Sequence, residues 1–259
     1  MVNDKGRDSI QVIWKEPNSR RQYVVGEILK NGKYEFSYGY EVKEAIKNGF
    51  ELLISFKDLE KTYYNDKLFP SFANRLPDKK RRGIENILKR YDLDQFDEYE
   101  LLKRCGAKLP TDNLEFIDPI PRDLEKNEII RYFFIAGVRY YIGCKGNLCD
   151  KTIEIDEMQE LRLVRDNNNK YDKYAIRVYD LENNHIGYVP RYYSENISNL
   201  LENNYKYNLK TYIVNKNNQC DECIKVKLEF YKWCCNYFAA SFILNIILSS
   251  LIVLIFYFT

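Results

Sequence analysis

The last 23 residues of the chain, 237–259, contain no charged side chain, and Asn245 is their only strongly polar member. At 1.5 Å per residue, a helix of this length spans roughly 34 Å, enough to cross a hydrocarbon core of about 30 Å. The segment is apolar on every side, whereas a surface helix would show a single apolar stripe. The sequence therefore predicts a transmembrane helix over residues 237–259, with a buried C-terminal helix as the alternative.

The charges beside this segment predict its orientation. Lys225, Lys227 and Lys232 precede the apolar run, and the positive-inside rule places such residues on the cytoplasmic side. Residues 1–9 are polar and lack the apolar core of a signal peptide. We therefore expect a single-pass, tail-anchored membrane protein whose soluble domains lie in the cytoplasm.

The charge balance limits the functions open to the soluble part. Lys and Arg number 40 against 38 Asp and Glu, so the formal net charge is +2. A protein that coats nucleic acid with its whole surface is thereby excluded, and any nucleic-acid site must be local. His185 is the single histidine, which excludes metal motifs built on two histidines.

Apolar periodicity and turn residues predict an α+β domain over residues 1–122. Strands are expected at residues 10–14, from residue 23 and at 33–38, with Asn31-Gly32 as the hairpin turn before the last of them. Helices are expected at residues 42–48, 58–64, 79–91 and 97–104. Pro110, Pro119 and Pro121 predict a linker toward the second domain.

Short strands at regular spacing predict a small β-barrel with one helix over residues 127–232. Gly137 divides two strand-like runs, and Ser194 can cap a helix that reaches residue 203. The expected strands are residues 129–136, 138–142, 160–164, 174–179, 185–189, 206–214 and 224–230.

Four separated blocks of this second half resemble the HIRAN domain. They are FIAGVRYY at 134–141, LRLVRDNNNKYD at 161–172, YAIRV at 174–178 and HIGYVPR at 185–191. Their order and spacing match the family, and the resemblance covers about residues 129–230. It implies an OB-like barrel that captures the 3′ end of single-stranded DNA, as HIRAN domains do where their function is understood.

The resemblance implies a DNA-end site whose residue types suit that task. Capturing an end requires an acceptor for the terminal 3′ hydroxyl, aromatic faces for the last bases and cations for the last phosphates. Asp172 is the candidate acceptor, and Tyr188 stands where a DNA-binding member has another polar ring. By the family pattern, the pocket positions are Arg139, Tyr140, Asn168, Asn169, Tyr171, Asp172 and Arg191, and Tyr188, which departs from the pattern, completes eight predicted DNA-binding residues.

Several of these residues also have an ordinary structural interpretation. Asp172 follows a turn and can cap it by accepting hydrogen bonds from backbone amides. Asn168 and Asn169 can be turn formers, and Tyr171 and Tyr188 can belong to the core. The sequence leaves these alternatives open.

Residues 26–38, 68–77 and 99–106 resemble the N-terminal subdomain of HipA-type toxin kinases, and this fainter likeness covers about residues 20–120. The kinase body is missing, because no Gly-rich loop, HRD-like catalytic loop or DFG motif follows. The resemblance therefore implies a docking module for a protein partner and no kinase activity. A basic stretch here is either a solvated helix face or a second phosphate-contacting patch; it comprises Arg75, Lys79, Lys80, Arg81, Arg82, Lys89 and Arg90.

We expect no enzyme activity and no cofactor, with structural zinc as the one alternative. Cys144, Cys149, Cys220 and Cys223 could supply four thiolates, but they are otherwise ordinary cysteines in loops. No G-x-x-x-x-G-K-[ST] motif of a helicase motor occurs in the chain. The sequence thus predicts a non-enzymatic, membrane-tethered protein that binds 3′ ends of single-stranded DNA. The alternative is a protein–protein interaction module at the membrane without DNA binding.

Overall fold

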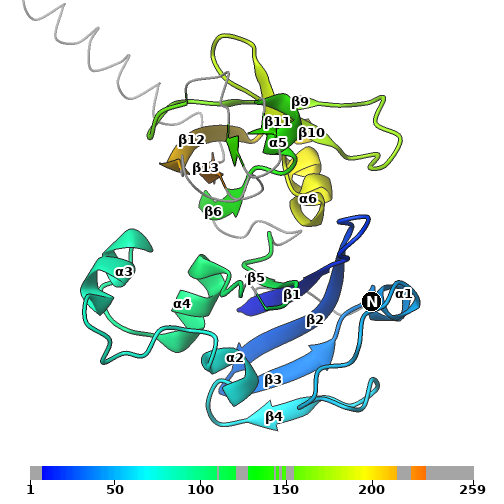
Figure 1. Ribbon diagram of the computed structural model, residues 1–259, viewed down its shortest axis with the longest axis vertical. Helices are drawn as coiled ribbons and strands as arrows, with labels where there is room; N and C mark the ends of the chain where they lie inside the picture. The colour runs from blue at the N-terminus through cyan, green and yellow to red at the C-terminus, as the bar shows by residue number, and fades with distance from the viewer. Residues whose placement is uncertain are drawn as a thin grey trace, which may run out of the picture.

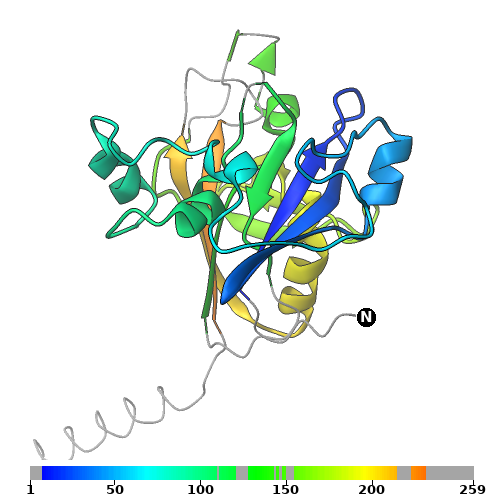
Figure 2. The same ribbon diagram turned by 90° about the horizontal axis from the view of Figure 1, so that it is seen from below.

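The computed structural model describes residues 8–109, 111–120, 128–142, 144–145, 148–149, 155–214 and 223–231, without the side chains of 144–145 and 148–149. These residues form a mixed α+β protein, which confirms the predicted class. They divide into a first domain (residues 8–120) and a second domain (residues 128–231), which lie one above the other in Figure 1. Figure 2, seen from below, has the first domain in front of the second.

The first domain is built on an antiparallel sheet with the strand order β4-β3-β2-β1-β5. Its strands are β1 (Ser9–Lys15), β2 (Gln22–Asn31), β3 (Lys33–Tyr38), β4 (Tyr63–Asn65) and β5 (Leu114–Ile117). Gly32 has a φ of 72° between β2 and β3, which fits the predicted hairpin turn. The linker prediction is wrong for β5, because a distant pairing partner, β1, holds this short segment in the sheet.

The helices of the first domain are α1 (Val42–Lys47), α2 (Pro70–Ala73), α3 (Ile84–Arg90) and α4 (Glu98–Cys105). α4 begins where the sequence predicts, because Asp97 Oδ1 accepts hydrogen bonds from the backbone nitrogens of Tyr99 (2.8 Å) and Glu100 (3.1 Å). α3 is shorter than the predicted 79–91, since Gly83 takes a left-handed conformation (φ 80°) directly before it. The helix predicted at 58–64 is wrong, because β4 occupies its end and pairs with β3.

Phenylalanine rings fill the core of the first domain. The ring centroids of Phe36 and Phe56 are 4.2 Å apart, and Phe72 lies 5.3 Å from both Phe56 and Phe116. All of these side chains are buried. The contacts join β3 and β5 to α2 and to the segment before β4, so the rings close one face of the sheet.

The second domain contains two antiparallel sheets, ordered β11-β10-β9 and β12-β13-β6, and a short β7-β8 pair. Its elements include β6 (Glu128–Phe134), β7 (Cys144–Lys145), β8 (Leu148–Cys149), β9 (Arg162–Arg165), β10 (Ile176–Tyr179), β11 (His185–Tyr188), α6 (Arg191–Glu202), β12 (Lys206–Val214) and β13 (Ile224–Tyr231). Isolated bridges between Ala136 and Tyr188 and between Glu160 and Lys210 connect the larger sheets. The closed OB-like barrel remains a prediction.

Two local predictions in the second domain are wrong. The predicted strand 138–142 is instead the helix α5 (Val138–Tyr141), which follows Gly137 in a left-handed conformation (φ 72°). Val138 and Ile142 are both fully buried, and a spacing of four residues places them on one face of a helical turn. α6 begins at Arg191, and its N-cap is Pro190, four residues before the predicted cap Ser194.

Strands β1 and β2 of the first sheet are buried on both faces because they separate two cores. Side chains alternate along a strand, so Val12 of β1 enters the core of the first domain whereas Ile13 enters that of the second. In the same way, Val25 of β2 faces the first core and Val24 the second. The core of the second domain therefore includes side chains of the first.

Polar contacts add to this junction. Tyr193 of α6 donates a hydrogen bond to the carbonyl oxygen of Asp118 (2.5 Å), and Asn196 Nδ2 donates to that of Ile120 (2.9 Å). The buried Lys225 donates from Nζ to the carbonyl oxygen of Arg104 (3.3 Å) and lies 4.9 Å from the Tyr91 ring centroid. Apolar and polar contacts thus join the domains along several elements.

Two predictions fall wholly or partly outside the described residues. In the part of the chain that the structure describes, no helix has the length and apolar character needed to cross a bilayer. The predicted transmembrane segment 237–259 lies outside that part. So do Cys220 and the side chains of Cys144 and Cys149, whereas Cys223 is buried in the core of the second domain.

Candidate nucleic-acid interface

The loop between β9 and β10 is fixed by Asn169. Its Oδ1 accepts hydrogen bonds from the backbone nitrogens of Tyr171 (2.9 Å) and Asp172 (3.1 Å). This turn leaves the Tyr171 side chain 95% exposed. Asn169 is therefore a turn former, as one interpretation of the sequence has it, and Tyr171 is not a core residue. The neighbouring Asn168 is exposed.

Asp172 caps the same loop with one of its carboxylate oxygens. Its Oδ1 accepts a hydrogen bond from the backbone nitrogen of Tyr174 at 2.9 Å. Among the described residues, no hydrogen bond is recorded for the other oxygen, Oδ2. Asp172 is only partly buried and lines a cleft between the domains. The carboxylate therefore combines a structural contact with an oxygen that a ligand can reach.

A buried carboxylate, Asp166, connects this loop to β10 and β11. Its Oδ1 accepts a hydrogen bond from Arg177 Nη2 (2.9 Å), and its Oδ2 accepts from the Tyr188 hydroxyl (2.8 Å) and from Asn169 Nδ2 (3.3 Å). Burial alone would raise the pKa of Asp166, but these hydrogen bonds outweigh it and lower the pKa. Burial and the bond to Asp166 raise the pKa of Tyr188 to about 12.

The sequence prediction contains Tyr188 and Asn169 but misses Asp166 and Arg177, which hold them. Asp166 directly follows the strand β9, where an aspartate usually indicates a turn. The alternation of β10 could have indicated the role of Arg177, because this residue lies between the buried residues Ile176 and Val178. A cation flanked in this way on a short strand indicates a carboxylate partner nearby.

Helix α5 carries the remaining part of the predicted site. Tyr140 is 72% exposed, and the Arg139 guanidinium lies 5.2 Å from the centroid of its ring. The next residue, Tyr141, packs against His185 at 4.0 Å and against Tyr188 at 5.9 Å between ring centroids. Tyr188 thus links α5 to Asp166 and, through it, to the β9–β10 loop.

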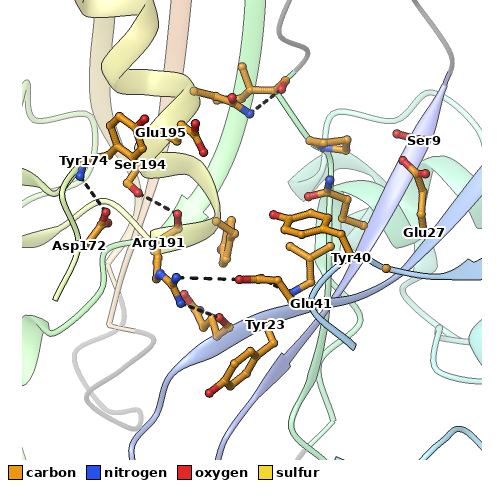
Figure 3. A pocket seen from close by; sticks show the side chains of 18 of the residues that line it. Ser9, Tyr23, Glu27, Tyr40, Glu41, Asp172, Tyr174, Arg191, Ser194 and Glu195 are labelled. Carbon is orange, nitrogen blue, oxygen red and sulfur yellow. Dashed lines mark hydrogen bonds and ion pairs between the residues drawn. The ribbon is translucent and has the colours of Figure 1, made fainter. Parts of the chain in front are cut away.

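A cleft of about 960 Å³ opens beside this loop, between the two domains. Figure 3 shows its walls: Asp172, Tyr174, Arg191, Ser194 and Glu195 come from the second domain, and Ser9, Tyr23, Glu27, Tyr40 and Glu41 from the first. Of the eight predicted residues, Tyr171, Asp172 and Arg191 line it.

Arg191, the predicted phosphate cation at the start of α6, contacts the first domain. Its Nη2 lies 3.9 Å from Glu41 Oε1, and its Nη1 donates to the carbonyl oxygen of Gln22 at 3.5 Å. Both contacts are long and partly exposed to solvent, so they are weak. Arg191 can exchange them for a phosphate at small cost.

The described residues do not test the zinc alternative. The backbones of Cys144 and Cys149 pair across β7 and β8, and Cys223 is fully buried. Within the described part of the chain, no group of three or more His, Cys, Asp or Glu side chains could hold a metal ion.

Comparisons with known proteins identify both domains. Residues 131–232 match the family model of the HIRAN domain, and residues 20–110 match that of the HipA N-terminal domain. No curated protein matches the chain.

Solved structures that are similar to this chain cover about two fifths of it. The crystal structure of the HIRAN domain of human HLTF is 18% identical, covering 40% of this chain and 73% of that one, with a TM-score of 0.28. A crystal structure of a protein from Lactobacillus plantarum is 17% identical, covering 41% and 99%, with a TM-score of 0.31. An NMR structure of the HLTF HIRAN domain in its DNA-bound conformation is 20% identical, covering 40% and 73%, with a TM-score of 0.26. The two family matches carry the assignment: the chain contains a HipA N-terminal domain followed by a HIRAN domain.

Proposed function

We propose that this chain binds nucleic acid without catalysis, and that its HIRAN domain captures 3′ ends of single-stranded DNA. The family match over residues 131–232 supports the proposal, because HIRAN domains of understood function resemble barrels that hold such ends. The weak net charge of +2 also fits a short end site better than a long duplex track.

The observation that carries the proposal is the geometry of the β9–β10 loop. Asn169 holds the backbone so that Tyr171 is exposed beside the partly buried Asp172. An exposed ring suits stacking on a base, and a carboxylate oxygen within reach suits a hydroxyl donor that only a strand end has. Arg139, Tyr140 and Arg191 would supply a further ring and the cations for the last phosphates.

Binding of linear oligonucleotides with different ends tests this function. A 3′ phosphate removes the hydroxyl donor and places negative charge against Asp172, so it should weaken binding by about 2–3 kcal/mol, roughly 30- to 150-fold. A circular strand of equal length should also bind much more weakly. Asp172→Ala should reduce the preference for a free end, whereas Glu182→Ala, at an exposed position of the β10–β11 turn, should keep it. Equal affinity for circular and linear strands would contradict end capture.

We also propose that residues 237–259 tether the protein to a membrane, with the two domains in the cytoplasm. The support is the uncharged run itself and the lysines that precede it. Full-length protein should sediment with membranes, and a chain ending at residue 237 should not. Full-length protein in the soluble fraction would contradict the tether.

A second function, binding of a basic protein segment, is favoured by the charges of the cleft. Carboxylates outnumber cations along its walls: Glu27, Glu41, Asp172 and Glu195 against Lys173 and Arg191. Such a surface attracts cations and repels phosphates. Titration with a fluorescent oligolysine peptide tests this alternative, and unchanged anisotropy would remove it.

A further inference from the structure

The cleft beside the HIRAN loop has one wall from each domain, as Figure 3 shows. The second domain contributes the β9–β10 loop and the first turn of α6. The first domain contributes the central strands of its sheet and the segment after β3, where Tyr40 is 79% exposed. The predicted site residues Tyr171 and Asp172 therefore face a space that the HipA N-terminal domain closes.

The hairpin end between β1 and β2 also reaches the predicted site. Gln22, just after this turn, accepts the hydrogen bond from Arg191. The first domain thus contacts the predicted phosphate cation Arg191 through both Gln22 and Glu41.

The interior of the cleft suits an aromatic ring better than a phosphate. Its carboxylates outnumber its cations, which disfavours anions. Two tyrosines that line the same space have exposed rings, Tyr40 of the first domain at 79% and Tyr171 of the second at 95%. A cavity of about 960 Å³ lies at the upper end of the usual size of small-molecule pockets, so a nucleobase and its sugar can enter.

We propose that the HipA N-terminal domain forms half of the DNA-end site. The base of the terminal nucleoside enters the cleft between the domains and stacks on Tyr40 of the first domain. This inference rests on the proposed capture of DNA ends by the HIRAN domain. It adds a stacking residue that the HIRAN domain alone lacks.

Fluorescence anisotropy of the full chain with a 5′-labelled oligothymidylate carrying a free 3′ hydroxyl tests the inference. Tyr40→Ala should weaken binding at least about fivefold, the lower end of what one stacked base contributes. Its matched control is Tyr64→Ala, because Tyr64 is 63% exposed on β4 and does not line the cleft.

The outcomes separate this inference from the function on which it rests. If Tyr171→Ala weakens binding while Tyr40→Ala matches the Tyr64→Ala control, the HIRAN domain captures the end alone and the inference is wrong. If the wild-type chain does not bind the oligonucleotide, the proposed function fails and the inference falls with it. If oligolysine binds and Tyr40→Ala abolishes only that binding, the cleft belongs to a cationic partner. Tyr40 is exposed, so its removal leaves the core intact and a loss of affinity reports on the site.

Discussion

The two domains use aromatic side chains in opposite ways. In the HipA N-terminal domain, phenylalanine rings such as Phe36 and Phe56 are buried against each other and form the core. In the HIRAN domain the core is mainly aliphatic, and Tyr140 and Tyr171 are 72% and 95% exposed. Aromatic residues make up 15% of the chain, yet only their position relative to a core separates rings that stabilise the fold from rings that can meet a ligand.

The largest effect on stability should come from the ring cluster of the first domain. Phe56→Ala removes a buried ring that contacts Phe36, Phe69 and Phe72. It should lower the free energy of unfolding by about 3–5 kcal/mol, because lost burial and a cavity add together. Urea denaturation measures this, with Phe56→Leu as a control that keeps most of the volume. A loss below about 1 kcal/mol would mean that the ring cluster does not stabilise the domain.

An intermediate effect should follow from breaking the polar centre of the HIRAN domain. Asp166→Asn weakens the hydrogen bonds to Arg177 and Tyr188, and should lower the free energy of unfolding by about 1–3 kcal/mol. The pKa of Asp166 is lowered in the folded state. Its carboxylate therefore stabilises the fold above about pH 4, and this contribution is lost as the pH falls through the folded pKa.

The pH dependence of the free energy of unfolding distinguishes the contribution of the Asp166 charge from that of the side chain's shape. The asparagine variant has no carboxylate to titrate there, so its stability should fall less steeply than that of the wild type on acidification below about pH 4. Urea denaturation at several pH values between neutrality and pH 3 measures both slopes. Parallel curves for the two proteins would show that the Asp166 charge contributes nothing.

The smallest effect on stability should come from an exposed ring of the second domain. Tyr171→Ala should change the free energy of unfolding by no more than about 0.5 kcal/mol, as is usual for surface positions. The same change should weaken binding to single-stranded DNA by about 1–3 kcal/mol. Thermal unfolding and anisotropy on one sample measure both quantities. A large loss of stability with unchanged affinity would show that Tyr171 stabilises the fold, as the buried rings of the first domain do, and does not bind DNA.

Local signals predicted much of the fold, because local chemistry decides those elements. Asn31-Gly32 specifies its hairpin, Asp97 caps α4, and the alternating run at 206–214 is β12 with the same bounds. The failures occur where distant contacts decide. β5 exists through its pairing with β1, and the apolar run after Gly137 becomes a helix because Val138 and Ile142 pack on one side.

In the candidate site, too, the sequence predicted the features that depend on local chemistry and missed those that depend on distant contacts. The family pattern placed Tyr171 and Asp172 on one loop, and the structure has them side by side with their backbone held by Asn169. No local pattern predicts that Arg191 meets Glu41, or that Tyr40 lines the same cleft, because these residues belong to separate domains. Docking between domains depends on whole surfaces, which periodicity and motifs do not encode.

The core that crosses the domain boundary has a consequence for how the protein melts. Ile13, Val24, Ile117 and Ile120 belong to the first domain but pack within the hydrophobic cluster of the second. The boundaries of the two family matches reflect evolutionary descent. Cooperative unfolding depends instead on the apolar surface that two regions bury against each other. The two families therefore do not correspond to two independent folding units. Calorimetry of the intact chain should give a single transition, and either half expressed by itself would present an open apolar surface that favours aggregation.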